Sequence, residues 1–193
     1  MKEYTSITLS KGKPLIVHNP TTYKQIGQGA QGAVFQLSSK RCVKIYMSEK
    51  HCKQERKVLK AAKSLKSPYF PKLYAAGKKY VEMEFIDGVP ILDFLKDKKK
   101  VPAWLAKEFI AMITHMKKLN FTRLDASPRH VLITKEKRIV VIDHVNSYRT
   151  LTPYPEKILN GLAAIGLREQ FLHKVKALDS GLYESWSVQS ANA

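Results

Sequence analysis

Three glycines and one lysine near the start of the chain have the types and spacing to hold phosphate groups. Gly27, Gly29 and Gly32 form the pattern G-x-G-x-x-G, and Val34 follows two residues after the last glycine. A glycine-rich turn has no side chains at its tip, so its backbone can close over a phosphate. The lysine is Lys44, which stands alone among apolar neighbours and can supply a positive charge to the same phosphates.

The residues after the glycines distinguish between two kinds of glycine motif. A dinucleotide-binding fingerprint requires a helix whose N-terminus holds the pyrophosphate. Here the apolar run 33–37 follows the glycines, and the polar residues 38–40 follow that run. The pattern therefore predicts a β-hairpin with glycines in its turn, then a third strand at 42–46. A flexible surface hairpin without a ligand has the same pattern.

A carboxylate near this lysine is predicted to point inward. Residues 48–66 predict a helix with Ser48 as its N-cap and with a basic stripe on its outer side. Glu55 lies three residues before Val58 of the apolar face, so it shares that face. Because burying an unpaired charge is costly, we expect a Lys44–Glu55 ion pair. A slightly rotated helix would instead leave Glu55 in solvent.

Two aspartates lie at the ends of a second predicted hairpin. Its apolar runs are 131–133 and 139–142, and the charged residues 135–137 separate them. Asp125 precedes the first run and Asp143 follows the second. Antiparallel pairing of the runs would bring both carboxylates to one edge of the hairpin.

The remaining pattern predicts strands first and helices afterwards. Residues 1–20 indicate an irregular or β-like segment, and 71–76 and 80–86 indicate strands. Further helices are expected at 91–99, 102–119 and 155–178, the last interrupted at Gly161 and Gly166, before a frayed tail at 188–193. Trp104 and Trp186 are interpreted as packing residues. The change from strands to helices near residue 87 predicts two lobes.

In this order, the motifs resemble the protein kinase family over residues 20–145. Residues 27–34 match the glycine-rich loop G-x-G-x-x-G-x-V in full. The other matched segments are 42–44 for the V-A-x-K lysine, Glu55 for the C-helix glutamate, 81–88 for the gatekeeper and hinge, 123–125 for H-R-D and 142–145 for D-F-G. The resemblance implies an α+β, two-lobed protein kinase-like fold. Its N-lobe would be an antiparallel sheet at 1–86, and its truncated helical C-lobe would span 87–193.

The resemblance also implies an ATP-dependent phosphotransferase, in particular a serine/threonine protein kinase. Asp125 would be the base, Lys44 and Glu55 would complete the catalytic group, and Asp143 with His130 would bind Mg2+ or Mn2+. ATP would be bound by Ile26, Gly27, Gly29, Gly32, Val34, Lys44, Met83, Glu84 and Ile86.

The chain departs from the kinase pattern at several positions. His130 replaces the metal-binding asparagine, and imidazole suits magnesium less well than an amide oxygen. His144 and Val145 replace the last two residues of D-F-G, and Ser127 stands where protein kinases carry a lysine. The serine is similar to that of RIO-type kinases. Only 50 residues follow Asp143, without A-P-E. The chain therefore resembles minimal RIO-like or small bacterial putative serine/threonine kinases.

These departures leave two other functions open. One is a pseudokinase that binds nucleotide and acts as a scaffold or regulator, which the histidines at 130 and 144 and the short C-lobe favour. The other is an RNA-linked ATPase or a small-molecule kinase, and the net charge of +18 suggests the RNA-linked version.

Composition sets the remaining expectations. The charge of +18 favours an anionic partner such as an acidic protein or nucleic acid, although solvation of a basic surface explains it equally well. No apolar run is long enough to span a membrane, so a cytoplasmic location is expected. Cys42 and Cys52 are too few for a disulfide framework and are expected to be reduced.

Overall fold

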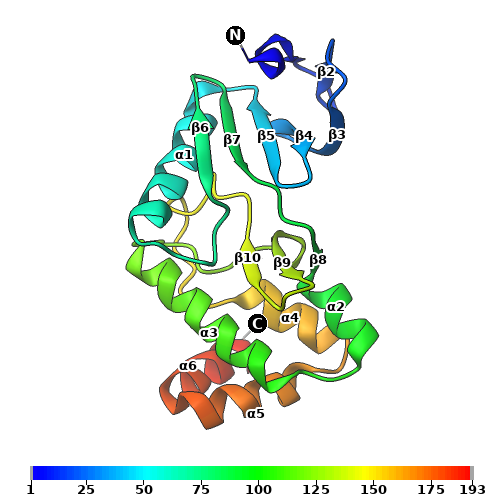
Figure 1. The fold of residues 1–193 in the computed structure, drawn as a ribbon. Coiled ribbons are helices and arrows are strands. Elements are labelled where there is room, and N and C mark those ends of the chain that lie inside the picture. Colours follow the sequence, from blue (N-terminus) through cyan, green and yellow to red (C-terminus); the bar gives the residue numbers. More distant parts are fainter. Residues whose placement is uncertain (1, 192–193) are drawn as a thin grey trace. The chain divides into compact units, whose positions relative to one another are not determined.

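The computed structural model describes residues 2–191 and confirms the α+β class with an antiparallel sheet. The chain divides into two compact units, of which the first ends at Ile86 and the second begins at Asp87. Strands dominate the first unit and helices the second (Figure 1).

The first unit is built on a five-stranded antiparallel sheet with the order β3-β4-β5-β7-β6. These strands are β3 (Lys24–Gly29), β4 (Gly32–Ser38), β5 (Arg41–Tyr46), β6 (Leu73–Ala76) and β7 (Tyr80–Glu84). The helix α1 (Glu49–Ser64) packs against β5, β6 and β7 (Figure 1). The 3-10 helix η1 (Glu3–Ser6) is followed by a hairpin of β1 (Thr8–Ser10) and β2 (Ile16–His18), so the described part of the N-terminal segment, residues 2–20, is partly regular.

The central strand β5 is buried from Cys42 to Tyr46 because both of its faces are covered. Val43 and Ile45 belong to a core that also contains Tyr4 and Phe35, so the N-terminal segment covers one face. Lys44 alternates with these residues and therefore points to the opposite face, where α1 packs.

The helix α1 begins as predicted and ends earlier than predicted. The Ser48 side chain caps it by accepting a hydrogen bond from Lys50 N at 3.1 Å. The helix ends at Ser64, and Lys66 adopts a positive φ of 50°. Leu65 is the C-cap and is 37% exposed, because the helix ends before it.

The second unit combines helices with a three-stranded antiparallel sheet of order β10-β9-β8. The strands are β8 (Gly88–Pro90), β9 (Val131–Thr134) and β10 (Ile139–Val141), and the 3-10 helix η2 (Pro128–His130) precedes β9. The helices are α2 (Ile91–Lys98), α3 (Ala103–Lys118), α4 (Glu156–Ala164), α5 (Arg168–Leu178) and α6 (Ser180–Ala191). The pairing of β9 with β10 confirms the second predicted hairpin.

Three features of the second unit differ from the prediction. The strand β8 was not expected; it pairs with the distant β9. The helix α4 continues through Gly161, where a Cβ would lie 2.3 Å from Leu92, so this glycine allows α2 to pack closely. The helix α6 extends to Ala191, which contradicts a frayed end from residue 188; residues 192–193 lie outside the described range.

Both tryptophans are packing residues, as predicted. Trp186 is 1% exposed, and its ring stacks on Phe171 with centroids 6.3 Å apart. Trp104, on α3, meets the Phe94 ring edge-on at 6.0 Å. Aromatic contacts therefore join α2 to α3 and α5 to α6.

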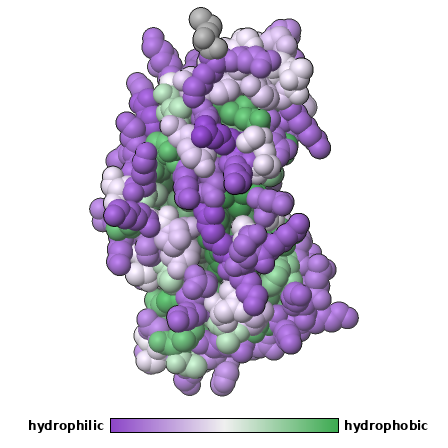
Figure 2. All heavy atoms as spheres, in the orientation of Figure 1, coloured by the Kyte–Doolittle hydropathy of each residue, from purple (hydrophilic) through white to green (hydrophobic). Residues whose placement is uncertain are grey.

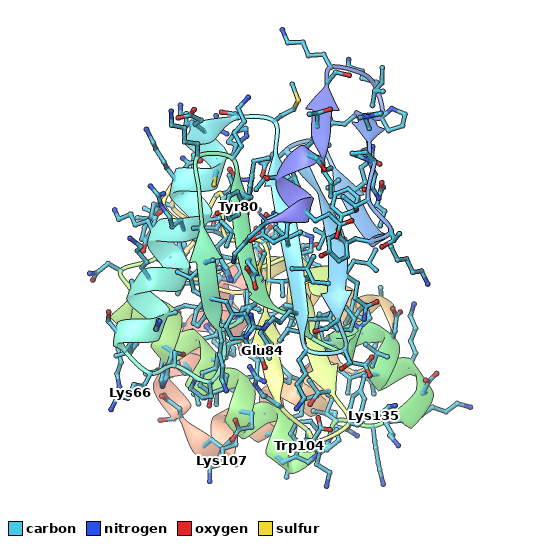
Figure 3. All side chains as sticks on the ribbon, turned by 45° about the horizontal axis from the view of Figure 1, so that its top comes forward. Lys66, Tyr80, Glu84, Trp104, Lys107 and Lys135 are labelled. Carbon is cyan, nitrogen blue, oxygen red and sulfur yellow. The ribbon has the colours of Figure 1, made fainter. Side chains whose placement is uncertain are left out.

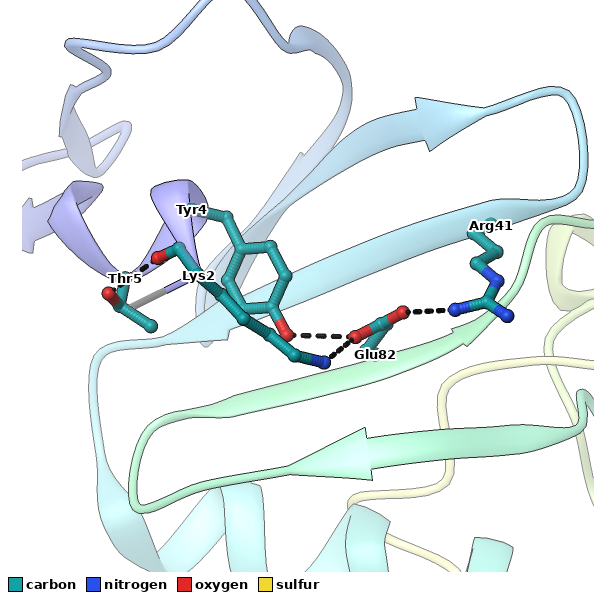
Figure 4. A network of polar contacts seen from close by, with 5 residues as sticks. All are labelled: Lys2, Tyr4, Thr5, Arg41 and Glu82. Atoms are coloured by element: carbon teal, nitrogen blue, oxygen red, sulfur yellow. Dashed lines mark hydrogen bonds and ion pairs between the residues drawn. The ribbon is translucent and has the colours of Figure 1, made fainter.

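A buried carboxylate on β7 holds the N-terminal segment on the sheet (Figure 4). Glu82 is 3% exposed and accepts hydrogen bonds from Tyr4 Oη at 2.8 Å and Arg41 Nη1 at 3.0 Å. Lys2 Nζ contacts the same carboxylate, and Thr5 Oγ1 donates to the Lys2 carbonyl. Burial raises the pKa of Glu82, but the hydrogen bonds from Lys2, Tyr4 and Arg41 outweigh it, so the pKa lies below the ordinary value.

The Glu82 network predicts a pH-dependent contribution to stability. The pKa is lower in the folded state, so the contribution is present above the unfolded pKa and is lost as pH falls through the folded pKa. Glu82→Gln should lower the free energy of unfolding by about 1–3 kcal/mol at pH 7, measured with urea. The exposed control Glu169→Gln should have little effect. A Glu82→Gln deficit that stays constant from pH 7 to pH 3 would contradict this account.

Candidate functional site

The predicted glycine-rich hairpin is present between β3 and β4. Gly29 pairs with Gly32, and residues 30–31 form the turn. Gly27 pairs with Val34, and the register shifts between Gln25 and Gly27, so Ile26 is bulged out of the ladder and 38% exposed.

The surrounding structure requires glycine at one of these three positions and not at the other two. A Cβ on Gly32 would lie 2.1 Å from the Ile45 carbonyl oxygen, so the neighbouring backbone requires glycine there. A Cβ on Gly27 would meet Val34 at an ordinary 3.8 Å, and one on Gly29 would meet nothing within 4 Å. The packing of the fold therefore explains Gly32, whereas Gly27 and Gly29 leave backbone open to a ligand.

This difference can be measured by two matched substitutions. Gly32→Ala should destabilise the chain by about 3 kcal/mol or more, because the contact is with backbone and cannot relax through a side chain. Gly29→Ala should change the free energy of unfolding by less than about 1 kcal/mol. Equal effects of the two substitutions in urea unfolding would show that the hairpin does not pack against β5 as described.

The predicted ion pair between Lys44 and Glu55 is confirmed. Lys44 Nζ lies 3.2 Å from Glu55 Oε2, and the two side chains are 11% and 1% exposed. The Lys44 ammonium also lies 5.1 Å from the centre of the Tyr46 ring. Lys44 is paired in register with Val34, so both side chains share one face of the sheet. One face therefore carries a fixed cation beside the glycine-rich hairpin.

The residues predicted to hold adenine lie where β7 ends (Figure 3, where Tyr80 and Glu84 mark its two ends). Met83 pairs with Cys42 and is 7% exposed, and Ile86 is 9% exposed. The Glu84 N–H donates to the Lys72 carbonyl at 2.9 Å, and the Glu84 side chain accepts from Lys72 N at 3.1 Å. The Glu84 N–H is thus already used within the first unit.

In the second unit, Asp125 is buried and bound to the start of α4. Its side chain is 3% exposed, and Oδ1 accepts a hydrogen bond of 2.7 Å from Lys157 N. Lys157 Nζ contacts Oδ2, and Arg123 Nη2 lies 3.8 Å from the same oxygen. The backbone of Leu124 is held by Thr152 O at 2.8 Å. Nothing in the local pattern around Asp125 indicated Lys157, because the two residues are 32 positions apart.

The hairpin of β9 and β10 brings His130 next to Asp143. Val131 pairs with Val141, and Ile142 N donates to the His130 carbonyl at 2.9 Å. His130 Nε2 then lies 3.8 Å from Asp143 Oδ2, and the two side chains are 26% and 36% exposed. An imidazole nitrogen and a carboxylate oxygen thus meet at this edge.

The backbone at Asp143 is in an uncommon conformation. Its φ is 63°, the left-handed region, which costs a non-glycine residue about 1–2 kcal/mol. The next residue, His144, is 2% exposed, and its Nε2 lies 2.9 Å from the Val141 carbonyl oxygen. The buried imidazole anchors the turn and so holds Asp143 in this conformation. Strain held in this way is often found at functional residues.

The metal-binding side chains of Asp143 and His130 suit a metal ion that also binds the phosphate oxygens of a ligand. Among residues 2–191, no group of three or more His, Cys, Asp or Glu side chains could hold a metal ion. Asp143 and His130 offer two donors. Magnesium commonly binds to one or two carboxylates and completes its shell with phosphate oxygens and water. Asp143 suits that arrangement, whereas the His130 imidazole is a weaker ligand for such an ion.

The basic stripe predicted on α1 is exposed to solvent. Lys53, Lys57 and Lys60 are exposed, whereas Arg56 is half-buried and its Nη1 lies 3.5 Å from the Gly77 carbonyl oxygen. Hydrophilic residues cover most of the face drawn in Figure 2. The positive charge therefore lies largely on the surface, where it is available to an anionic partner or to water.

The two cysteines are free, as expected for reduced thiols, and the structure also shows that both are buried. Burial raises the pKa of Cys42 to about 12 and that of Cys52 to about 11. Both thiols therefore stay protonated near neutral pH, and neither is suited to act as a nucleophile.

No protein-family model matches the chain, and no curated protein matches it either. Within residues 2–191, none of the helices has the length and apolar character needed to cross a membrane.

Proposed function

We propose that this chain is an ATP-dependent phosphotransferase that phosphorylates serine or threonine hydroxyl groups of a protein. The observation that carries the proposal is the buried Lys44–Glu55 pair on the same sheet face as Val34, beside the open backbone of Gly27 and Gly29. Residues 1–86 would then act as the N-lobe, and 87–193 as the C-lobe, of a protein kinase-like fold.

In the first unit, the hairpin and Lys44 would hold the phosphates of ATP. Glu55 fixes the position of the ammonium group. A cation that is already oriented loses little entropy when a phosphate binds. Ile26 and Val34 would contact the adenine from the hairpin, and Met83, Glu84 and Ile86 would contact it from the end of β7.

In the second unit, Asp143 would bind the Mg2+ or Mn2+ ion that accompanies ATP, with His130 beside it. When bound, the ion neutralises the charge that develops on the transferring phosphoryl group. Asp125 would orient the attacking hydroxyl and accept its proton. Each carboxylate oxygen has two lone pairs, so Asp125 can accept a substrate hydroxyl in addition to its present donors.

The proposal predicts that label moves from radioactive ATP to an acceptor protein in the presence of magnesium or manganese. Asp143→Asn should lower the rate by about a hundredfold or more, because the metal loses its carboxylate ligand. Asp97→Asn, an exposed aspartate on α2, is the matched control and should leave the rate unchanged. Transfer that survives Asp143→Asn at full rate would refute the proposal.

A second candidate is a pseudokinase, which His130 and His144 favour because they stand at positions where the resembled family uses other residues. A chain that transfers no label but melts at a higher temperature with ATP would be such a nucleotide-binding scaffold or regulator. Release of phosphate without an acceptor would instead favour an ATPase, and steep salt dependence of RNA binding would link it to RNA.

A further inference from the structure

The first turn of α4 places a lysine directly on the predicted catalytic base. Lys157 contacts Asp125 twice, through its backbone N–H to Oδ1 and through Nζ to Oδ2. The backbone contact caps α4, whose N-cap residue, Pro155, makes no side-chain hydrogen bond to the helix. Because Asp125 supplies the missing acceptor, the start of α4 is fixed beside the Asp125 carboxylate. The Lys157 side chain, which extends from this turn, is held there as well.

The charges around this carboxylate do not balance. Asp125 is 3% exposed, whereas Lys157 and Arg123 are 47% and 29% exposed. One buried negative charge therefore faces two partly exposed positive charges. The N-terminus of α4 adds a partial positive charge of its own. Glu156, in the same turn of α4, offsets part of this charge. The two cationic side chains are still more exposed than the Asp125 carboxylate, so they are available to an anionic group that approaches it.

The arrangement leaves the ammonium able to bind a second oxygen. A lysine ammonium has three N–H donors, and Asp125 Oδ2 accepts from one. A phosphoryl oxygen close to Asp125 could accept from another. Ser127 is closer to Asp125 in sequence, but its hydroxyl carries no charge. The positive charge next to Asp125 Oδ2 is that of Lys157 on α4.

We propose that Lys157 is a further catalytic residue: its ammonium bridges the Asp125 carboxylate and the phosphoryl group during transfer. This inference rests on the proposed phosphotransferase function. Lys157 orients the base through one contact and neutralises developing phosphoryl charge through the other. The proton of the substrate hydroxyl passes to Asp125, and the phosphoryl group passes from ATP to the substrate oxygen with ADP as the leaving group.

The test compares Lys157→Met with Lys157→Arg in the label-transfer assay. Both variants keep the backbone N–H that caps α4, so both should fold. Lys157→Met should melt below Lys157→Arg, because it removes a charged contact from the buried Asp125 carboxylate. Lys157→Met should lower kcat by about a hundredfold with little change in KM for ATP, because the contact acts on the transferring group. Lys157→Arg, which keeps the charge, should recover much of that loss. Lys107→Met, an exposed lysine on α3 (Figure 3), is the control and should leave kcat unchanged.

The outcomes separate this inference from the proposed function. If Asp125→Asn abolishes transfer while Lys157→Met leaves kcat unchanged, the phosphotransferase stands and the role of Lys157 is refuted. If Lys157→Met and Lys157→Arg are equally slow and both melt well below the unchanged protein, the lysine is structural only, and the inference is again refuted. Absence of transfer by the unchanged protein would refute both.

Discussion

The buried ion pair between Lys44 and Glu55 fixes the charge around which the candidate site of the first unit is arranged. It places two charges between β5 and α1, where apolar residues of similar size would stabilise the packing as well or better. The pair fixes the position of the Lys44 ammonium on the sheet face shared with Val34, beside the glycine-rich hairpin. This fixed cation is the observation that supports the proposed nucleotide site.

In the second unit, two carboxylates are likewise held in fixed positions at a cost in free energy. Asp143 has a φ of 63°, and the buried His144 holds the turn that follows it. Asp125 is a buried carboxylate that receives donors from Lys157. Each arrangement costs conformational or desolvation energy. Such costs are expected where side chains are pre-organised for chemistry, because fixed charges need no rearrangement when the charge of the transition state develops.

Local periodicity predicted those parts of the fold and site that depend on neighbours in sequence. Alternation and glycine placement predicted both hairpins, and the helical period placed Glu55 opposite Lys44. The contact of Lys157 with Asp125 and the pairing of β8 with β9 join segments far apart in the chain, and no local pattern encodes them. The prediction that Gly161 interrupts the helix was wrong for the same reason: the close packing of α2, which is distant in sequence, makes glycine suitable within α4.

The central claim, that Lys44 serves a nucleotide, is tested most directly by calorimetric titration with ATP and magnesium. The comparison is the double variant Lys44→Met with Glu55→Leu, which replaces the buried pair by apolar residues and so should keep the fold. The account predicts saturable binding by the unchanged chain and its loss in the folded double variant. Equal binding by both proteins, or no binding by the folded unchanged chain, would contradict it.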